Sequence, residues 1–179
     1  CSNAKIVAPD INVSGSTLAS VGASVNVVNT DTQTKALIDK AAKITSQGNL
    51  NVNALSKHTM TNVITGASVA VTGVAGQGTV QTWKDHSDVF ATIGNTKGVS
   101  AKSISVNAKN DRTLDSTLVG ASVALYGALN GAVITADVSG SAEAGIGDAT
   151  GTYDGEVKAT DGDITISSEA NTDMKASAT

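Results

Sequence analysis

The sequence predicts an all-β protein folded as a parallel β-helix, a solenoid whose stacked coils are joined by loops of variable length. A short alternating phrase recurs along the chain, and the phrase Gly-Ala-Ser-Val recurs three times. Aromatic residues make up 2% of the 179 residues, and there is one proline. A narrow stacked core can be filled by small and β-branched side chains, whereas a wide globular core usually contains aromatic ones. An antiparallel β-sandwich is the alternative fold.

Four segments alternate strictly between apolar and polar residues, which predicts half-buried strands. They are DINVS (10–14), NLNVNA (49–54), SISVNA (103–108) and DITISS (163–168). We expect the apolar residues to face the core and the Asn, Ser, Thr and Asp residues to face solvent. The inward set would be Ile11, Val13, Leu50, Val52, Ala54, Ile104, Val106, Ala108, Ile164 and Ile166.

The Gly-Ala-Ser-Val phrase contains no acid, base or metal ligand, which indicates a structural role. Its glycines are Gly22, Gly66 and Gly120. Glycine permits a bend or bulge that a Cβ would obstruct. We therefore expect the three glycines to mark the same corner in successive layers of the stack.

A third phrase, Ala-x-Ile followed by Gly or Asp, completes the cycle. It occurs at positions 36–39, 91–94 and 144–147. Its alignment predicts a strand and turn at each place. A helix over residues 34–44 is the alternative for the first copy, because Leu37, Ala41 and Ile44 would share one face.

The spacing of the phrases predicts a single domain cut from a longer repeat array. The approximate repeats are 15–54, 59–108 and 113–168 within residues 5–179, and a further Gly-Ala-Ser-Val would start at position 180. Coils of roughly 20 residues would give a rod of eight or nine coils, about 40 Å long. Residues 1–4 are interpreted as the remnant of tag cleavage. A native, lipidated Cys1 is the other interpretation.

Composition disfavours several partners. The formal net charge is −4, and no basic face is visible, so nucleic acid is a poor partner. No apolar stretch approaches the roughly 20 residues that a membrane-spanning helix needs, so we expect no membrane insertion of this segment. Cys1 is the only cysteine, which precludes an internal disulfide.

The cycle of VGASV, ATIG and SISVNAK resembles the repeats of large bacterial surface exoproteins, the filamentous haemagglutinin-like and leukotoxin-like filamentous adhesins. The resemblance covers nearly the whole chain and concerns architecture. It implies a right-handed parallel β-helix, secretion by an autotransporter or two-partner route, and a place on the surface of a Gram-negative-type bacterium. It implies no catalytic motif.

Candidate binding residues are few. Trp83, Lys84, Asp85 and His86 fall in a tract of variable spacing, which predicts an exposed loop that could contact a protein or a glycan. On that prediction, replacing Trp83 with alanine leaves the fold intact. The acidic tract 139–163 lacks known calcium-loop spacings, and the two histidines lack partners at ligand spacing. We therefore expect no metal, no cofactor and no catalytic residue.

These observations predict a non-enzymatic role as a stalk segment of a secreted surface adhesin that attaches to host or bacterial cell-surface molecules. One alternative is a carbohydrate-active β-helix enzyme, either a polysaccharide lyase or a hydrolase. Another is a lipid-anchored structural protein of the surface. A solenoid with uncovered strand edges at both ends also predicts end-to-end self-association.

Overall fold

The computed structural model describes residues 2–38, 42–147 and 155–179, and these residues form strands and turns only. No helix among them is long and apolar enough to cross a membrane. The strands are β1 (Ser2–Val7), β2 (Asp10–Ser16), β3 (Ala19–Ile38), β4 (Lys43–Thr45), β5 (Leu50–Ala70), β6 (Val74–Ile93), β7 (Gly98–Ala101), β8 (Ile104–Ala124), β9 (Gly127–Ser139), β10 (Ala142–Ile146), β11 (Val157–Ala159) and β12 (Ile164–Ala178). Cys1 lies outside the described residues.

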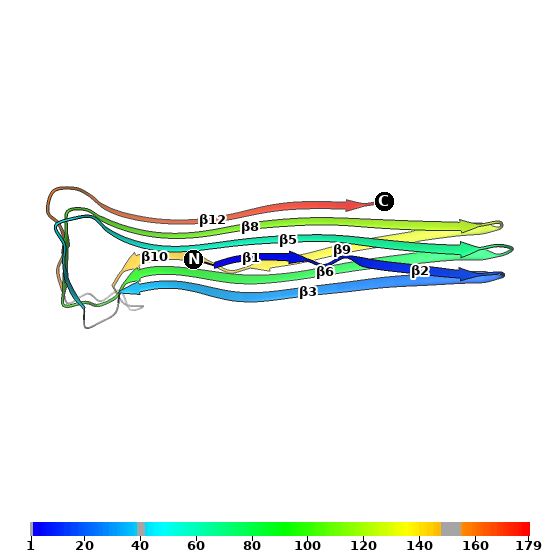
Figure 1. The fold of residues 1–179 in the computed structure, drawn as a ribbon, viewed down its shortest axis with the longest axis horizontal. Coiled ribbons are helices and arrows are strands. Elements are labelled where there is room, and N and C mark those ends of the chain that lie inside the picture. Colours follow the sequence, from blue (N-terminus) through cyan, green and yellow to red (C-terminus); the bar gives the residue numbers. More distant parts are fainter. Residues whose placement is uncertain (1, 39–41, 148–154) are drawn as a thin grey trace.

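The strands wind into a flattened parallel solenoid of three sheets. Sheet A contains β1 and β2, then β5, β8 and β12; sheet B contains β3, β6 and then β9 with β10; sheet C contains β4, β7 and β11. Every pairing between strands is parallel. The predicted parallel β-helix is therefore confirmed, and the sandwich alternative is wrong. Figure 1 shows the long strands of sheets A and B lying side by side along the molecule.

Each coil is far longer than the sequence-based expectation. Leu50 pairs with Ile104, Gly66 with Gly120 and Ser68 with Ser122, and the members of each pair are separated by 54 positions. One coil contains a strand of 21 residues, a strand of 20 residues and a strand of 4 residues, as in β5, β6 and β7. The chain thus makes three coils plus a fourth strand in sheet A. The long axis of the molecule consequently runs along the strands (Figure 1), not along the direction of stacking, and the prediction of eight or nine coils is wrong.

Two of the three recurrent phrases stack in register as predicted, except for the first copy of the alternating phrase at 10–14, which pairs with residues 64–68. Leu50, Ile104 and Ile164 form one row across sheet A. Ala36, Ala91 and Ala144 form a row across sheet B, as do Ile38, Ile93 and Ile146. The segment of the suggested helix is strand over residues 34–38 and 43–45.

The apolar core lies where the three sheets meet. Val52, Ala54, Ile104 and Val106 of sheet A pack there against Val89, Ala91 and Ile93 of sheet B and Val99 of sheet C. This is the end of the molecule with the long connections at the left of Figure 1. The opposite end consists of two sheets joined by tight turns, and its interior is polar: Ser24, Ser68, Gln77 and Thr79 are buried there.

The first alternating phrase has the opposite orientation from the prediction. Ile11 and Val13 are each 74% exposed, while Asp10, Asn12 and Ser14 alternate with them on the inner side of β2. The reason is the register, because β2 pairs Asn12 with Gly66 and Ser14 with Ser68 at the polar end of sheet A. The expectation that Ile11 and Val13 face inward is therefore wrong.

The predicted corner glycines lie inside strands. Gly66 and Gly120 pair directly with each other, whereas Gly22 belongs to β3 in the opposite sheet and pairs with Gln77. None of the three has a positive φ. A Cβ on Gly22 or Gly66 would overlap the side chain of Gln77. These two glycines therefore provide room for an amide that crosses the thin core, and the corner prediction is wrong.

A glycine that the backbone does require separates β9 from β10. Gly140 has a φ of 119°, and a Cβ there would overlap the backbone of Ser87. We expect Gly140→Ala to lower the free energy of unfolding by about 2–3 kcal/mol, because the backbone must shift and the residue remains strained. Chemical denaturation measures this. Gly131→Ala in β9 is the matched control, since its Cβ meets nothing within 4 Å; an equal loss in both variants would contradict the expectation.

Candidate functional site

The residues predicted to form a contact loop lie in the middle of strand β6. Trp83 is 2% exposed and Asp85 is 1% exposed, while Lys84 and His86, which alternate with them along the strand, are exposed. The loop prediction is therefore wrong for all four residues. The physical reason is that β6 continues without interruption from Val74 to Ile93, and residues 83–86 pair with β3 on one side and with β9 on the other.

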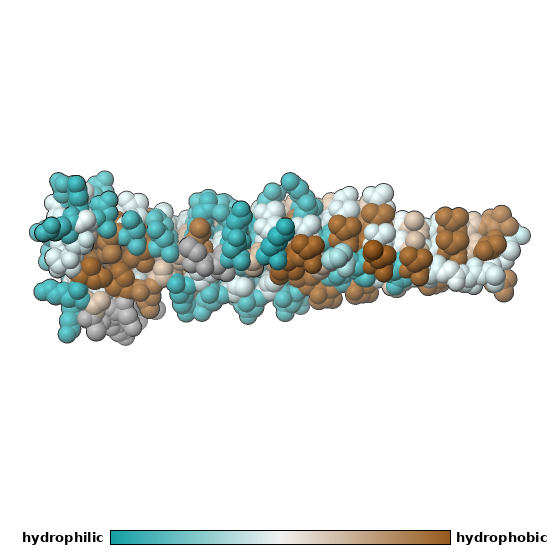
Figure 2. Space-filling model, in the orientation of Figure 1, coloured by the Kyte–Doolittle hydropathy of each residue, from teal (hydrophilic) through white to brown (hydrophobic). Residues whose placement is uncertain are grey.

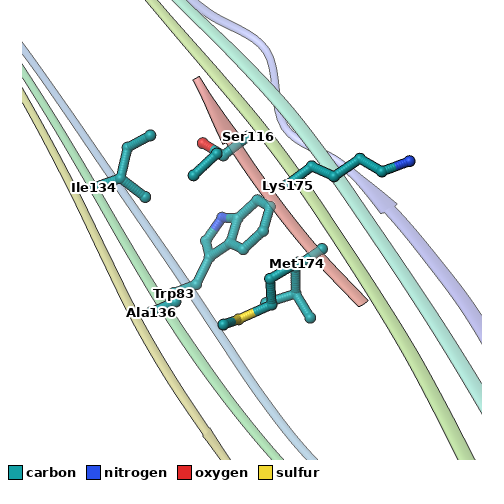
Figure 3. Close-up of a pocket in the computed structure, with 8 residues that line it drawn as sticks. Trp83, Ser116, Ile134, Ala136, Met174 and Lys175 are labelled. Carbon is teal, nitrogen blue, oxygen red and sulfur yellow. The ribbon is translucent and has the colours of Figure 1, made fainter. Parts of the chain in front are cut away.

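Trp83 packs in a small apolar cluster that divides two polar regions of the interior. It contacts the row of Met60 and Leu114 from sheet A, with Ile6 and Val28 partly buried against them. A cavity of about 170 Å³ lies beside the indole of Trp83, on the side that faces the last coil. It lies between β9 and β12, and its lining includes Leu114, Ile134, Ala136 and Met174. Figure 3 shows Trp83 between Ala136 and Met174. Trp83 therefore serves the interior, not an exposed contact surface.

A cluster of charged side chains is buried beside Trp83, and sequence reasoning missed it. His58 Nδ1 lies 3.3 Å from Asp85 Oδ1, and an Arg112 terminal nitrogen lies 4.0 Å from Asp85 Oδ2. Arg112, the single arginine, is 6% exposed and also donates to the Ser139 carbonyl at 2.6 Å. His58 and Arg112 are register partners. Their separation equals that of Gly66 and Gly120, and this is the only signal in the sequence that could have paired them.

Hydroxyl groups complete this cluster. Thr30 donates to Asp85 Oδ1 at 2.5 Å, and Thr32 and Ser56 each lie 3.2 Å from His58 Nε2. Ser56, His58 and Asp85 thus follow the order hydroxyl, imidazole, carboxylate of a hydrolase triad. Ser56 is completely buried, however, so no substrate reaches it in this arrangement. In this arrangement the cluster organises the interior between sheets A and B.

A second, exposed cluster surrounds the bend at Gly140. Asp88 Oδ1 accepts hydrogen bonds from the Ser141 amide at 2.9 Å and its hydroxyl at 3.0 Å, and His86 Nε2 lies 3.1 Å from Asp88 Oδ2. Partial desolvation raises the pKa of Asp88, but the bonds from Ser141 and the charge of His86 outweigh it. The pKa of Asp88 therefore lies below its ordinary value.

This pKa predicts a pH dependence of stability. Because the carboxyl pKa is lower in the folded state, its contribution is complete above the unfolded value of 3.8 and is lost as the pH falls through the folded value. We expect Asp88→Asn to lower the melting temperature at neutral pH, where the contribution of the carboxylate is complete, and to leave it nearly unchanged at a pH below the folded pKa, so that the acid limb of a plot of melting temperature against pH becomes flatter. The same acid limb in both proteins would contradict the assignment.

The outer face of sheet A carries polar ladders near the three-sheet end. Asn107 donates to Asn53 at 2.9 Å and accepts from Ser167 at 2.7 Å. Lys109 lies 3.4 Å from its register partner Glu169. Hydrogen bonding to Glu169 raises the pKa of Lys109, and bonding to Asn171 and Lys109 lowers the pKa of Glu169. Opposite charges on neighbouring coils are thus a feature of this surface.

The turn end of the rod carries almost no charge. No Lys, Arg, Asp or Glu occurs in 11–30, 59–83 or 116–136, and these three stretches stack on one another. Their outward residues are largely apolar, with Val21 82% exposed, and Val25, Val123 and Leu129 also exposed. Figure 2 shows this apolar surface over the right-hand half of the molecule, with hydrophilic residues gathered on the left.

Within the described residues, no group of three or more His, Cys, Asp or Glu side chains is placed to hold a metal ion. In the acidic tract, Asp148 and Asp154 lie outside the described residues, and Asp161 forms an exposed ion pair with Lys102 at 3.6 Å. Two further hollows lie beside β10 and beside β11. Comparisons of the chain with protein-family models, curated proteins and solved structures find no match.

Proposed function

We propose that this chain is a rod segment of a secreted bacterial surface adhesin, which spaces and presents surfaces for attachment to host or bacterial cells. The observation that carries the proposal is the repetition of the same rows of residues across successive coils, such as Leu50, Ile104 and Ile164. A stack built from repeated rows extends without a change of design, which suits a spacer of arbitrary length.

The distribution of charge supports this proposal over the carbohydrate-active enzyme. Enzymes that cleave glycosidic bonds need carboxylates that reach the sugar, and anionic sugars also need cations. In this chain the single arginine and its partner Asp85 are enclosed between the sheets. The carboxylates of Asp111 and Glu169 on sheet A are engaged by Lys109 and Asn171.

Two experiments test the proposal. Antibodies against the chain should label intact bacteria of the source species without permeabilisation, and beads coated with the chain should adhere to cells above an uncoated control. Labelling only after permeabilisation would exclude the surface role. Incubation with polyuronates should give no product; product formation that is lost in Glu156→Gln would favour the enzyme.

A further inference from the structure

We propose that Ser139, His86 and Asp88 form a hydrolytic site for neutral, short-chain carboxylic esters on the outer face of sheet B. The inference goes beyond the adhesin role and does not depend on it. The Ser139 hydroxyl lies 3.1 Å from His86 Nδ1, and His86 Nε2 lies 3.1 Å from Asp88 Oδ2. A hydroxyl, an imidazole and a carboxylate joined in this order are the arrangement that activates a serine nucleophile.

Two neighbouring strands place the three side chains on one face. His86 and Asp88 are two positions apart on β6, so both point to the same side of the sheet. Ser139 is the last residue of β9 and the register partner of His86. Because the site is built on the pair of β6 and β9 and faces outward, a further strand beside β9 would not cover it.

Asp88 fixes the position of the proton on the imidazole. Its Oδ1 accepts hydrogen bonds from the amide and the hydroxyl of Ser141, which leaves Oδ2 to accept from His86. An ionised carboxylate only accepts hydrogen bonds, so the proton of the neutral imidazole lies on Nε2 and the lone pair of Nδ1 faces the Ser139 hydroxyl. In this arrangement His86 is the general base, and Asp88 is a positioning residue.

The site is open to solvent, in contrast to the cluster around His58. The side chain of His86 is 51% exposed and that of Asp88 is 23% exposed, and Ser139 is exposed as well. Ser56 beside His58 is completely buried. An ester can therefore approach the Ser139 hydroxyl from solvent without a change in the fold.

The neighbouring side chains define the class of ester. Asp31 on β3 is the other register partner of His86, and Asp137 lies two positions before Ser139 on the same face of β9. These carboxylates disfavour an anionic substrate, so we infer a neutral one. The polar surroundings suit a short acyl group on a polar alcohol, such as an O-acetylated neutral sugar.

Lys84 provides a positive charge beside the nucleophile. It lies two positions before His86 on β6 and is the diagonal neighbour of Ser139 across the strand pair, a separation that a long side chain spans. Its ammonium forms no ion pair within the described part of the chain. We expect it to stabilise the oxyanion that forms when Ser139 attacks the carbonyl.

The reaction needs water as its only second reactant. Ser139 Oγ forms a bond to the carbonyl carbon, and its proton passes to His86 Nδ1. The bond between that carbon and the alcohol oxygen breaks, and the alcohol leaves with the proton from Nδ1, so that the serine is acylated. Water then adds to the acyl carbon while His86 takes its proton. Return of this proton to Ser139 Oγ releases the carboxylic acid.

Covalent labelling tests the nucleophile. A fluorophosphonate probe should form an adduct on Ser139, located by peptide mass spectrometry, and Ser139→Ala should remove it. The control Thr135→Ser places a second hydroxyl on the same face of β9, opposite Thr82 instead of a histidine, and should gain no adduct. The absence of an adduct on Ser139, or equal labelling at position 135, would overturn the proposal.

Ester hydrolysis tests the base and the neighbouring charge. With p-nitrophenyl acetate, Ser139→Ala and His86→Ala should each lower kcat/KM about a hundredfold, and added imidazole should restore activity only to His86→Ala. Lys84→Gln should lower kcat/KM about fivefold. The control Lys57→Gln, an equal change of charge on the outer face of sheet A, should leave it unchanged. Hydrolysis that persists in Ser139→Ala would make His86 the nucleophile and overturn the role of the serine.

Substitution of Asp88 separates its positioning role from its role in the bend. Asp88→Asn should lower kcat about tenfold at an unchanged KM, measured at a temperature where circular dichroism shows the variant to be folded. Asp88→Glu, which keeps the carboxylate, should recover part of the loss. An unchanged kcat in Asp88→Asn would show that the carboxylate serves only the bend and would overturn its place in the site. None of these results bears on cell-surface localisation.

Discussion

Replacement of Trp83 with alanine is expected to lower the free energy of unfolding by about 3–5 kcal/mol. The indole is 2% exposed and is the largest fully buried side chain among the described residues. Its removal would leave Met60 and Leu114 without their partner from sheet B and would enlarge the cavity that already lies beside it. Urea denaturation followed by far-ultraviolet circular dichroism measures the change without depending on the lost fluorophore.

Two variants control for this effect. Trp83→Phe should lose much less stability, because the indole Nε1 has no hydrogen-bond partner among the described residues and an aromatic ring remains. Phe90→Ala removes an outward aromatic side chain of the same strand, whose ring lies 5.5 Å from Lys35 Nζ, and should cost less than about 1 kcal/mol. A Trp83→Ala protein as stable as Phe90→Ala would show that the tryptophan does not hold the sheets together.

The second large effect is expected for Asp85→Ala, which should lower the free energy of unfolding by about 3–5 kcal/mol. The substitution removes the carboxylate between His58 and Arg112 and leaves the guanidinium enclosed without its counter-charge. Thr30 also loses the shorter of its two hydrogen bonds and keeps only the longer one to the Lys84 carbonyl. Thermal and chemical denaturation of the variant measure the loss.

The matched control is Asp31→Ala, because Asp31 lies one residue from Thr30 but on the exposed face of β3. It should change stability by no more than about 0.5 kcal/mol. Combining Asp85→Ala with Arg112→Leu should recover part of the loss, since no buried charge then remains unpaired. A double variant less stable than Asp85→Ala would indicate that Arg112 acts chiefly through the Ser139 carbonyl.

Much of the stacking can be predicted from the sequence, because it depends on identity between coils. The rows that begin with Leu50 and Ala36 follow from repeated phrases, and both are confirmed. The coil length is also present in the sequence, as the separation between Gly66 and Gly120. The coil length expected from the sequence is too short because that expectation assigns each recurrent phrase to a separate coil. Gly22 shares the phrase but lies in sheet B, and no local signal distinguishes the two sheets.

The errors about side-chain orientation have one physical origin. Sequence reasoning places the apolar residue of each alternating pair inside, which holds for Val52 and Val106. Towards the turn end the interior is too narrow and polar for that rule, and Ile11 and Val21 face outward. The expectation for Trp83 fails because variable spacing suggests a loop there. The extra residues in fact lie around β11 and before β12, where the separation between paired strands is largest.

The parallel register also has a kinetic consequence. Every strand must find a partner that is more than 50 positions away in the sequence. Closing a loop of that length costs chain entropy before the contacts between the paired strands can form and offset that cost. Proteins dominated by such long-range pairing therefore fold slowly. A finished coil, however, offers a template on which the next can form strand by strand. A chain that emerges gradually from one end would therefore fold more efficiently than the same chain refolded all at once from denaturant.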